Sequence, residues 1–240
     1  QAMVAVKEAG VFDVSESEKV ATVPLNATPS GVEKSTAETA RPLATWAVLV
    51  TSGYNNVSPG NGGGHLWVLN AKTGAVIKKI STGAGSDSAA VAGSGCTAAP
   101  CPSGLSRISA WMDNVNINNT VTQVYGGDLF GNVWRFDLSK LKASSGDATV
   151  QLLATLQGPT NKPQPVSSWI ELGYANSSHI VYVGTGRYLG VPDINNKEVQ
   201  TIYAIKDPLT GSSPTASLYG SPRATACSAT LKTNCFMKQA

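Results

Sequence analysis

The stretch VYGGDLFGNVWRFDLS, residues 124–139, contains two short segments of alternating side chains separated by a glycine-rich turn. Successive side chains of an extended strand point to opposite faces, so NVWRFD offers one face for burial and the other to solvent or a neighbouring sheet. Asp128 and Asn132 flank the turn, where such side chains bond to nearby backbone groups. We therefore interpret the stretch as a structural turn between two strands, with Trp134 as a core residue.

Two charged side chains of the same segment, Arg135 and Asp137, lie on one face of the expected strand. They could form an ion pair with each other or with a partner across the strand. No histidine or second carboxylate is adjacent in sequence to Asp128 or Asp137, so we expect neither aspartate to be catalytic.

The composition favours an all-β protein with many turns. Charged residues make up 14% of the 240 residues, well below the roughly 25% usual in soluble domains. A formal net charge of +3 is too small to indicate binding to nucleic acid or an anionic membrane. No apolar run is long enough to span a membrane, and the first ten residues lack the pattern of a signal peptide. We expect a mature, truncated or partial chain.

Three segments of the chain resemble one another. Each contains an apolar run that ends in glycines, followed by an alternating segment with an aromatic residue at the same place: Trp67, Trp134 and Tyr203. A polar residue follows three positions later: Asn70, Asp137 and Lys206, with Asp207 beside the last. A small sheet cannot bury both of its faces alone, so such units stack radially in a β-propeller.

The sequence therefore predicts an all-β fold, a partial and modified β-propeller built of antiparallel sheets with long loop insertions. Propellers typically have about four to eight blades, and three repeats are fewer than that. We expect residues 1–40 to form an N-terminal arm that could hold one strand. Residues 41–210 would form the blades, and residues 211–240 a loop-rich tail closed by a disulfide.

The four cysteines form two local pairs, Cys96 with Cys101 and Cys227 with Cys235. Zinc sites favour closer Cys-x2-Cys spacing with His or Cys partners, and both histidines of the chain lie far from these pairs in sequence. We therefore expect two short-loop disulfides, with free thiols as the alternative. Disulfides form in oxidising compartments outside the cytoplasm.

Four blocks of the sequence occur in the same order as in a known family. They are WAVLVTSGYN, LWVLNAKTG, GDLFGNVWRFD and GTGRYL, within the range 46–208. On these blocks the chain resembles the C-terminal propeller domain of the PilY/PilC family, the type IV pilus tip and biogenesis proteins of Gram-negative bacteria. Residues 1–40 do not match the blade expected upstream, and the tail stops early for the family.

The resemblance implies a non-enzymatic protein without a cofactor that acts in pilus assembly, adhesion and twitching motility. It implies export through the periplasm to the pilus tip or the outer membrane surface. The implied partners are minor pilins and a host or abiotic surface. Two alternatives stay open: a quinoprotein-like propeller dehydrogenase, whose blades carry a similar Thr-Gly turn, and a periplasmic outer-membrane scaffold propeller.

Some members of the family bind calcium in a loop just before the strand that begins here at Val124. The corresponding positions in this chain are occupied by Asn114, Asn116, Asn118, Thr120 and Thr122. Calcium sites gain affinity from carboxylate oxygens, and Asp113 is one residue out of register with the alternating positions. We therefore expect this loop to bind calcium weakly or not at all.

The remaining candidates are loops and histidines. His65 and His179 each begin an expected strand, so we interpret them as turn or surface residues. Arg187 could reach Asp193 or another acidic partner. Binding residues concentrate on loops held by a rigid scaffold, and three insertions fit this description: residues 53–64, the insertion around Cys96 and Cys101, and residues 190–199.

Overall fold

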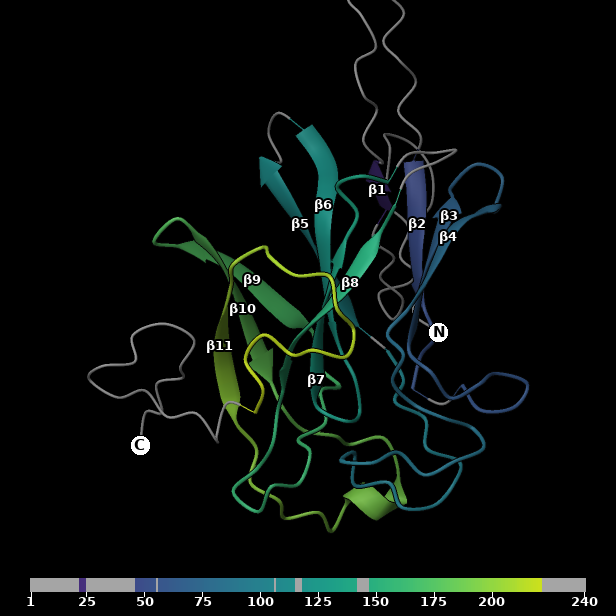
Figure 1. Cartoon of the computed structure of the whole chain (residues 1–240), viewed down its shortest axis with the longest axis vertical. Helices are drawn as coiled ribbons and strands as arrows, with labels where there is room; N and C mark the ends of the chain where they lie inside the picture. The colour runs from purple at the N-terminus through teal and green to yellow at the C-terminus, as the bar shows by residue number, and fades with distance from the viewer. Residues whose placement is uncertain are drawn as a thin grey trace, which may run out of the picture.

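The computed structural model describes residues 22–24, 46–54, 56–105, 107–114, 118–141 and 147–221. Within these ranges the regular elements are eleven strands and one short 3₁₀ helix, arranged in three separate antiparallel sheets (Figure 1). The predicted all-β fold class is confirmed. In this part of the chain no helix is long and apolar enough to cross a membrane.

Each sheet is a meander in which consecutive strands pair as neighbours. Sheet 1 consists of β1 (Thr22–Pro24), β2 (Trp46–Thr51), β3 (His65–Asn70) and β4 (Val76–Ser81). Sheet 2 consists of β5 (Ile108–Asn114), β6 (Asn118–Gly127), β7 (Asn132–Asp137) and β8 (Thr149–Thr155). Sheet 3 consists of β9 (Ile170–Ala175), β10 (Ser178–Gly184) and β11 (Ile202–Asp207), with the 3₁₀ helix η1 (Val191–Asp193) between β10 and β11.

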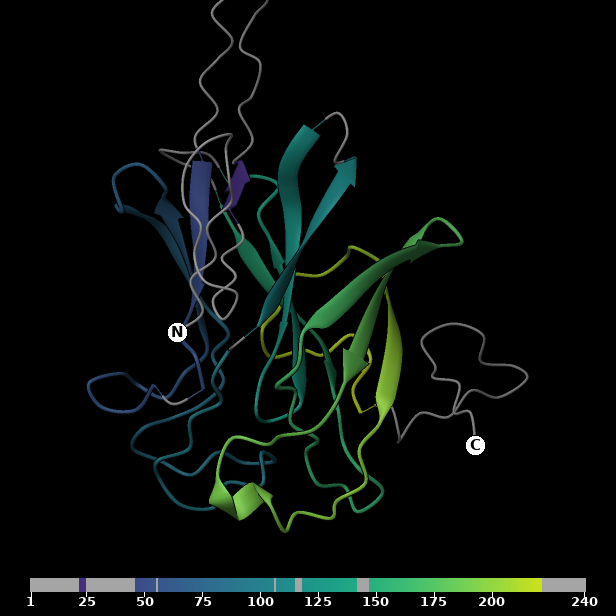
Figure 2. The same ribbon diagram turned by 180° about the vertical axis from the view of Figure 1, so that it is seen from behind.

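The sequence repeat corresponds to the second and third strands of the three sheets. Trp67, Trp134 and Tyr203 lie in β3, β7 and β11, which are the third strands of sheets 1, 2 and 3. Each sequence repeat therefore corresponds to the same pair of neighbouring strands in one of the three sheets. Sheet 2 lies between the other two sheets, as the view from behind shows (Figure 2).

Two hydrophobic clusters occupy the two faces of sheet 2. Trp134 and Phe136 pack in the cluster shared with sheet 1. Val133, one residue away, packs with Tyr203 and Ile205 in the cluster shared with sheet 3. Both faces of β7 therefore meet neighbouring sheets, which explains why its four middle residues are all buried although the sequence alternates.

The three repeated aromatic residues have different surroundings. Trp134 faces sheet 1 and Tyr203 faces sheet 2, so each faces the preceding sheet. In β3, Leu66 and Val68 pack towards sheet 2, and alternation places Trp67 between them on the opposite face, where it is half-buried. We call this opposite face, with Val50, Trp67 and Lys79 paired across it, the outer face of sheet 1.

Two glycines of the stretch 124–139 are required by structure. A Cβ atom on Gly127 would lie 2.3 Å from Cγ1 of Val166, so no side chain fits there. Gly131 has a φ of 78°, in the left-handed region that favours glycine. The glycine-rich turn thus serves close packing at one position and backbone conformation at the other.

The chain returns to sheet 2 after β11. Residues 208–221, here called the return segment, run beside the edge strand β8, where the backbone N–H of Leu152 donates to the carbonyl of Ser213 at 3.0 Å. The N–H of Thr155 donates to the carbonyl of Gly220 at 2.9 Å. The start of the predicted loop-rich tail is therefore held against the strand by main-chain hydrogen bonds.

The predicted disulfide between Cys96 and Cys101 is present. Cys101 also exchanges two backbone hydrogen bonds with Ser86, at 2.8 and 2.7 Å, which fix this insertion. Cys227 and Cys235 lie outside the described residues, so their pairing stays a prediction. The predicted limits of the N-terminal arm, the blades and the tail stay predictions as well.

Replacing both partners of the observed bridge, C96A/C101A, is expected to lower the free energy of unfolding by about 2 kcal/mol. The bridge joins residues only five apart in sequence, and a short loop restricts the unfolded chain least. Urea denaturation of the wild type and the variant measures the difference. A variant as stable as the wild type would contradict this expectation.

Candidate functional site

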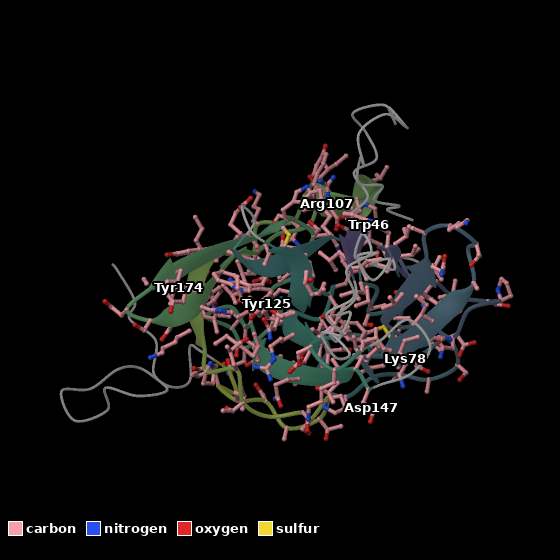
Figure 3. The ribbon with its side chains drawn as sticks, turned by 90° about the horizontal axis from the view of Figure 1, so that it is seen from above. Trp46, Lys78, Arg107, Tyr125, Asp147 and Tyr174 are labelled. Atoms are coloured by element: carbon pink, nitrogen blue, oxygen red, sulfur yellow. A yellow bond between two sulfur atoms is a disulfide. The ribbon has the colours of Figure 1, made fainter. Side chains whose placement is uncertain are left out.

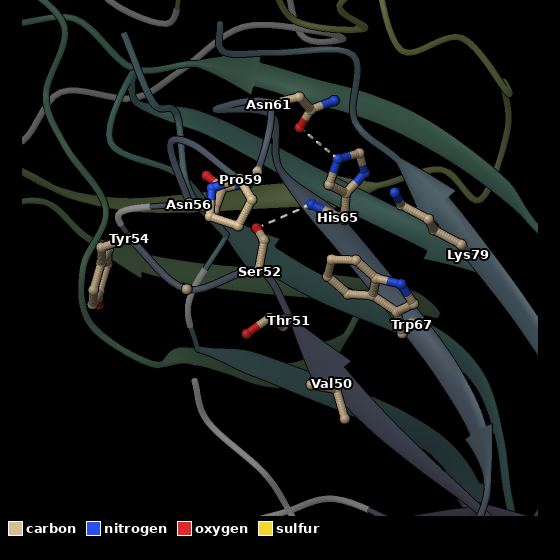
Figure 4. Close-up of a pocket in the computed structure, with 12 residues that line it drawn as sticks. Val50, Thr51, Ser52, Tyr54, Asn56, Pro59, Asn61, His65, Trp67 and Lys79 are labelled. Carbon is tan, nitrogen blue, oxygen red and sulfur yellow. Dashed lines mark hydrogen bonds between the residues drawn. The ribbon is translucent and has the colours of Figure 1, made fainter. Parts of the chain in front are cut away.

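A pocket of about 940 Å³ lies where the loop between β2 and β3 meets the outer face of sheet 1 (Figure 4). It coincides with residues 53–64, one of the insertions predicted to carry binding residues. Its lining includes Tyr54, Asn56, Asn61, His65, Trp67 and Lys79.

Short hydrogen-bonded turns order this loop. The N–H of Gly62 donates to the carbonyl of Asn56 at 3.0 Å, and the N–H of Gly60 donates to the carbonyl of Val57 at 2.8 Å. The Tyr54 hydroxyl donates to the carbonyl of Ser167, 113 residues away, at 2.6 Å. The loop is therefore fixed at its base and tied to a distant part of the fold.

His65 is buried, with 5% of its surface exposed, so its interpretation as a turn or surface residue was wrong. Its Nε2 lies 3.0 Å from Oδ1 of Asn61, an oxygen that also accepts the N–H of Gly63 at 3.0 Å. Because that oxygen can only accept, Nε2 carries the proton and Nδ1 has a free lone pair. Burial lowers the pKa of His65 and the Lys79 ammonium lowers it further, so the ring is neutral at pH 7.

Two buried polar atoms at the pocket have no hydrogen-bond partner among the residues that the structure describes: Nδ1 of His65 and Oδ1 of Asn56. The amide nitrogen of Asn56 donates to the carbonyl of Gly63, which fixes the orientation of the amide. Both unpartnered atoms are therefore acceptors. An unpartnered buried polar atom is costly, so these atoms are suited to receive donors from a bound molecule.

Trp67 and Lys79 form the wall on sheet 1. The Lys79 Nζ lies 5.2 Å from the centroid of the indole, and the His65 ring meets the indole edge-on at 5.3 Å. Asp and Glu are absent from the lining that the structure describes. The pocket thus combines an aromatic surface, one cation and neutral hydrogen-bonding groups, an arrangement suited to binding.

No group of three or more His, Cys, Asp or Glu side chains that could hold a metal ion occurs in the described ranges. Among the calcium-loop candidates, the structure describes Asp113, Asn114 and Asn118. Oδ1 of Asp113 accepts the Nε1–H of Trp111 at 2.8 Å, and the backbones of Asn114 and Asn118 pair across β5 and β6. Asn116 lies outside the described residues, and weak or absent calcium binding stays a prediction.

Asp128 has the turn role that the sequence predicted. Its Oδ1 accepts the backbone N–H groups of Phe130 at 2.9 Å and Asn132 at 3.0 Å. Its Oδ2 accepts the side-chain N–H groups of Asn132 at 2.9 Å and Trp134 at 3.0 Å. Burial raises the pKa of Asp128 to about 6, although these four donors act in the opposite direction. The carboxylate organises the hairpin from inside.

Arg135 pairs across the sheets and not with Asp137. Its NH1 lies 2.6 Å from Oδ1 of Asp207 in sheet 3, and both side chains are fully buried. The other oxygen of Asp207 accepts the hydroxyl of Tyr125 at 2.7 Å, and Tyr125 lies between sheets 2 and 3 (Figure 3). His179, predicted as a turn or surface residue, is buried beside Tyr125, with its Nδ1 3.5 Å from the hydroxyl.

Sequence reasoning missed this buried network because its partners lie 72 and 82 residues apart along the chain. One signal was available: an aspartate ends the third repeat. Asp207 follows Lys206 at the end of β11, and alternation places it on the same face as Tyr203 and Ile205, which pack towards sheet 2. The network holds sheets 2 and 3 together.

Arg187 reaches Asp193, as the sequence suggested. Its Nε lies 2.8 Å from Oδ1 of Asp193, and Oδ2 accepts the N–H of Leu189 at 2.9 Å. The hydrogen bond from Leu189 and the nearby guanidinium lower the pKa of Asp193. This carboxylate orders the loop that contains η1.

Three consecutive antiparallel meander sheets that stack through their faces are the features of a β-propeller module. The family model for the PilY1 β-propeller domain matches residues 31–234. The chain belongs to this family.

Relatives agree with this assignment. The chain is 30% identical over 173 residues to a type IV pilus biogenesis factor PilY1 homolog from Xylella fastidiosa, covering 68% of this chain and 11% of the relative. It is 27% identical over 189 residues to the type IV pilus biogenesis factor PilY1 of Pseudomonas aeruginosa, covering 68% and 14%. The chain thus spans only a small part of the relatives' length.

The crystal structure of the Pseudomonas aeruginosa PilY1 C-terminal domain has a similar fold. It matches with a TM-score of 0.57 and 21% sequence identity, over 84% of this chain and 39% of that chain. At this identity the likeness concerns the fold alone. The predicted family and the predicted partial propeller are both confirmed.

Proposed function

We propose that this chain is part of a type IV pilus biogenesis factor and acts there as a rigid, non-enzymatic module in pilus assembly, adhesion and twitching motility. The observation that carries the proposal is the match of the PilY1 β-propeller family to residues 31–234. The relatives are named type IV pilus biogenesis factors, which supports the proposal. Fold alone would not suffice, because one fold serves many functions.

The proposed location is the pilus tip or the outer membrane surface of a Gram-negative bacterium, after export through the periplasm. The Cys96–Cys101 disulfide supports an oxidising compartment. The proposed partners are minor pilins and a host or abiotic surface. The buried Arg135–Asp207 pair supports a rigid module, because it fixes two sheets relative to each other.

Deletion of the gene from the bacterium that encodes it is expected to abolish surface pili, twitching and attachment. Complementation with the complete gene should restore all three, and a gene lacking residues 46–221 should not. Electron microscopy counts pili, and spreading on agar measures twitching. Normal piliation, twitching and attachment in the deletion strain would refute the proposal.

Labelling of intact cells with a membrane-impermeant amine reagent tests the location separately. The exposed lysines, such as Lys79 and Lys197, should react in intact cells if the protein lies at the surface. A periplasmic scaffold would be labelled only after the outer membrane is opened. That result would favour the alternative location and remove the adhesive role.

A further inference from the structure

We propose that the pocket between the β2–β3 loop and the outer face of sheet 1 binds a saccharide unit that carries a carboxylate group. The inference deepens the adhesive part of the proposed function and rests on it for the biological source of the saccharide. Three features of the pocket support the inference: two hydrogen-bond acceptors without a partner in the described ranges, the aromatic surface of Trp67, and the Lys79 cation.

Two acceptor atoms in the pocket have no hydrogen-bond donor among the residues that the structure describes. Nδ1 of His65 and Oδ1 of Asn56 are buried and without a partner in the described part of the chain. The orientations of both side chains are fixed by their other hydrogen bonds, to Asn61 and Gly63. Both atoms can accept hydrogen bonds from O–H or N–H groups, which a saccharide supplies in number.

The aromatic surface suits the apolar face of a sugar ring. Trp67 is half-buried, on the face of β3 turned away from sheet 2, and it borders the pocket (Figure 4). The electron-rich face of an indole attracts the positively polarised C–H groups of a pyranose. The described part of the loop beside it is held by backbone hydrogen bonds, which limits the entropy lost on binding.

The Lys79 ammonium favours a ligand with a negative charge. The Lys79 ammonium lies 5.2 Å from the centroid of the indole, and the lining that the structure describes contains no acidic side chain to neutralise it. Burial keeps His65 neutral, so the pocket offers one positive charge beside neutral groups. A ring with hydroxyl donors and one carboxylate complements all three features, whereas a neutral sugar leaves the ammonium unused.

The test is calorimetric titration of the full-length protein with four probes. The acidic probes are 3′-sialyllactose and trigalacturonate, and their neutral matches are lactose and the trimethyl ester of trigalacturonate. We expect measurable binding of at least one acidic probe, and binding at least tenfold weaker for its neutral match. Absence of binding to both acidic probes at millimolar concentration, or equal binding of the neutral matches, would overturn the proposal.

Two neighbouring lysines provide a matched pair of variants. Lys79→Met should weaken binding of the acidic probe about tenfold, because it removes the cation and keeps an unbranched side chain. Lys78→Met removes the same charge one residue away. Lys78 lies on the other face of β4, with its Nζ 3.8 Å from Oδ1 of Asp147 (Figure 3), so this variant should bind like the wild type. Equal effects of the two variants would overturn the assignment.

Trp67→Ala should abolish binding of the probe, with circular dichroism reporting whether the fold is retained. Because Lys79 is exposed, the lysine pair tests the proposal even where Trp67→Ala unfolds. A strain carrying K79M should still assemble pili. Failure of saccharide binding is thereby distinguished from failure of the proposed role in pilus assembly.

Discussion

R135M is expected to lower the free energy of unfolding by about 3–5 kcal/mol. Arg135 and Asp207 are 1% and 2% exposed, and the substitution leaves a buried carboxylate without its cation, which is the costly way to break a buried pair. The variant also loses the hydrogen bonds from NH2 to the carbonyls of Thr210 and Gly211, at 2.7 and 2.8 Å. Urea denaturation followed by tryptophan fluorescence measures the loss.

R187M is the matched control. Arg187 makes a comparable bond to Asp193, but its side chain is 37% exposed, so the expected loss is below about 1 kcal/mol. The double variant R135M/D207N should be more stable than R135M, because it leaves no unpaired charge. If R135M and R187M lower the free energy of unfolding equally, the buried Arg135–Asp207 pair stabilises the fold no more than the partly exposed Arg187–Asp193 pair.

D128A is expected to lower the free energy of unfolding by about 3–5 kcal/mol, because it leaves four donors inside the hairpin without an acceptor, each at about 1 kcal/mol or more. D137A is the control at the other end of β7. Asp137 is only partly buried and accepts from the N–H and hydroxyl of Ser139, so its loss should be about 1 kcal/mol.

The effect of D128A should depend on pH. Folding raises the pKa of Asp128 from 3.8 to about 6, so the folded state binds a proton more readily than the unfolded chain. The stability that Asp128 contributes is therefore fully present below pH 3.8 and declines as the pH rises through about 6. The difference between wild type and D128A should be larger at pH 4 than at pH 7. A smaller difference at pH 4 would contradict the raised pKa.

Local pattern determined what could be predicted. The repeated glycine-ended runs and alternating segments identified the second and third strands of each sheet, because side-chain periodicity is a local property. The turn chemistry of Asp128 was predictable for the same reason: its four donors lie within six residues. The Cys96–Cys101 pair, five residues apart, likewise required no knowledge of the fold.

Interactions between sheets could not be predicted in this way. The sequence gives no direct sign that Arg135 meets Asp207, since the two approach only when sheets 2 and 3 stack. His65 begins β3 and His179 is the second residue of β10, but the sequence does not indicate that His65 contacts the Trp67 ring or that His179 stacks against Trp111. The pocket combines residues of a loop and two strands, so its composition became visible only with the fold.

The return segment has a mechanical consequence. Because residues 213–220 are hydrogen-bonded to β8, we expect a force applied at residue 221 to reach sheet 2 before it reaches β11. Leu152, Leu153 and Thr155 of β8 form backbone hydrogen bonds to the return segment. The Arg135 guanidinium adds two more, which it donates to the carbonyls of Thr210 and Gly211. The same contact covers the free edge of β8, whose backbone groups would otherwise be open to pairing with other chains.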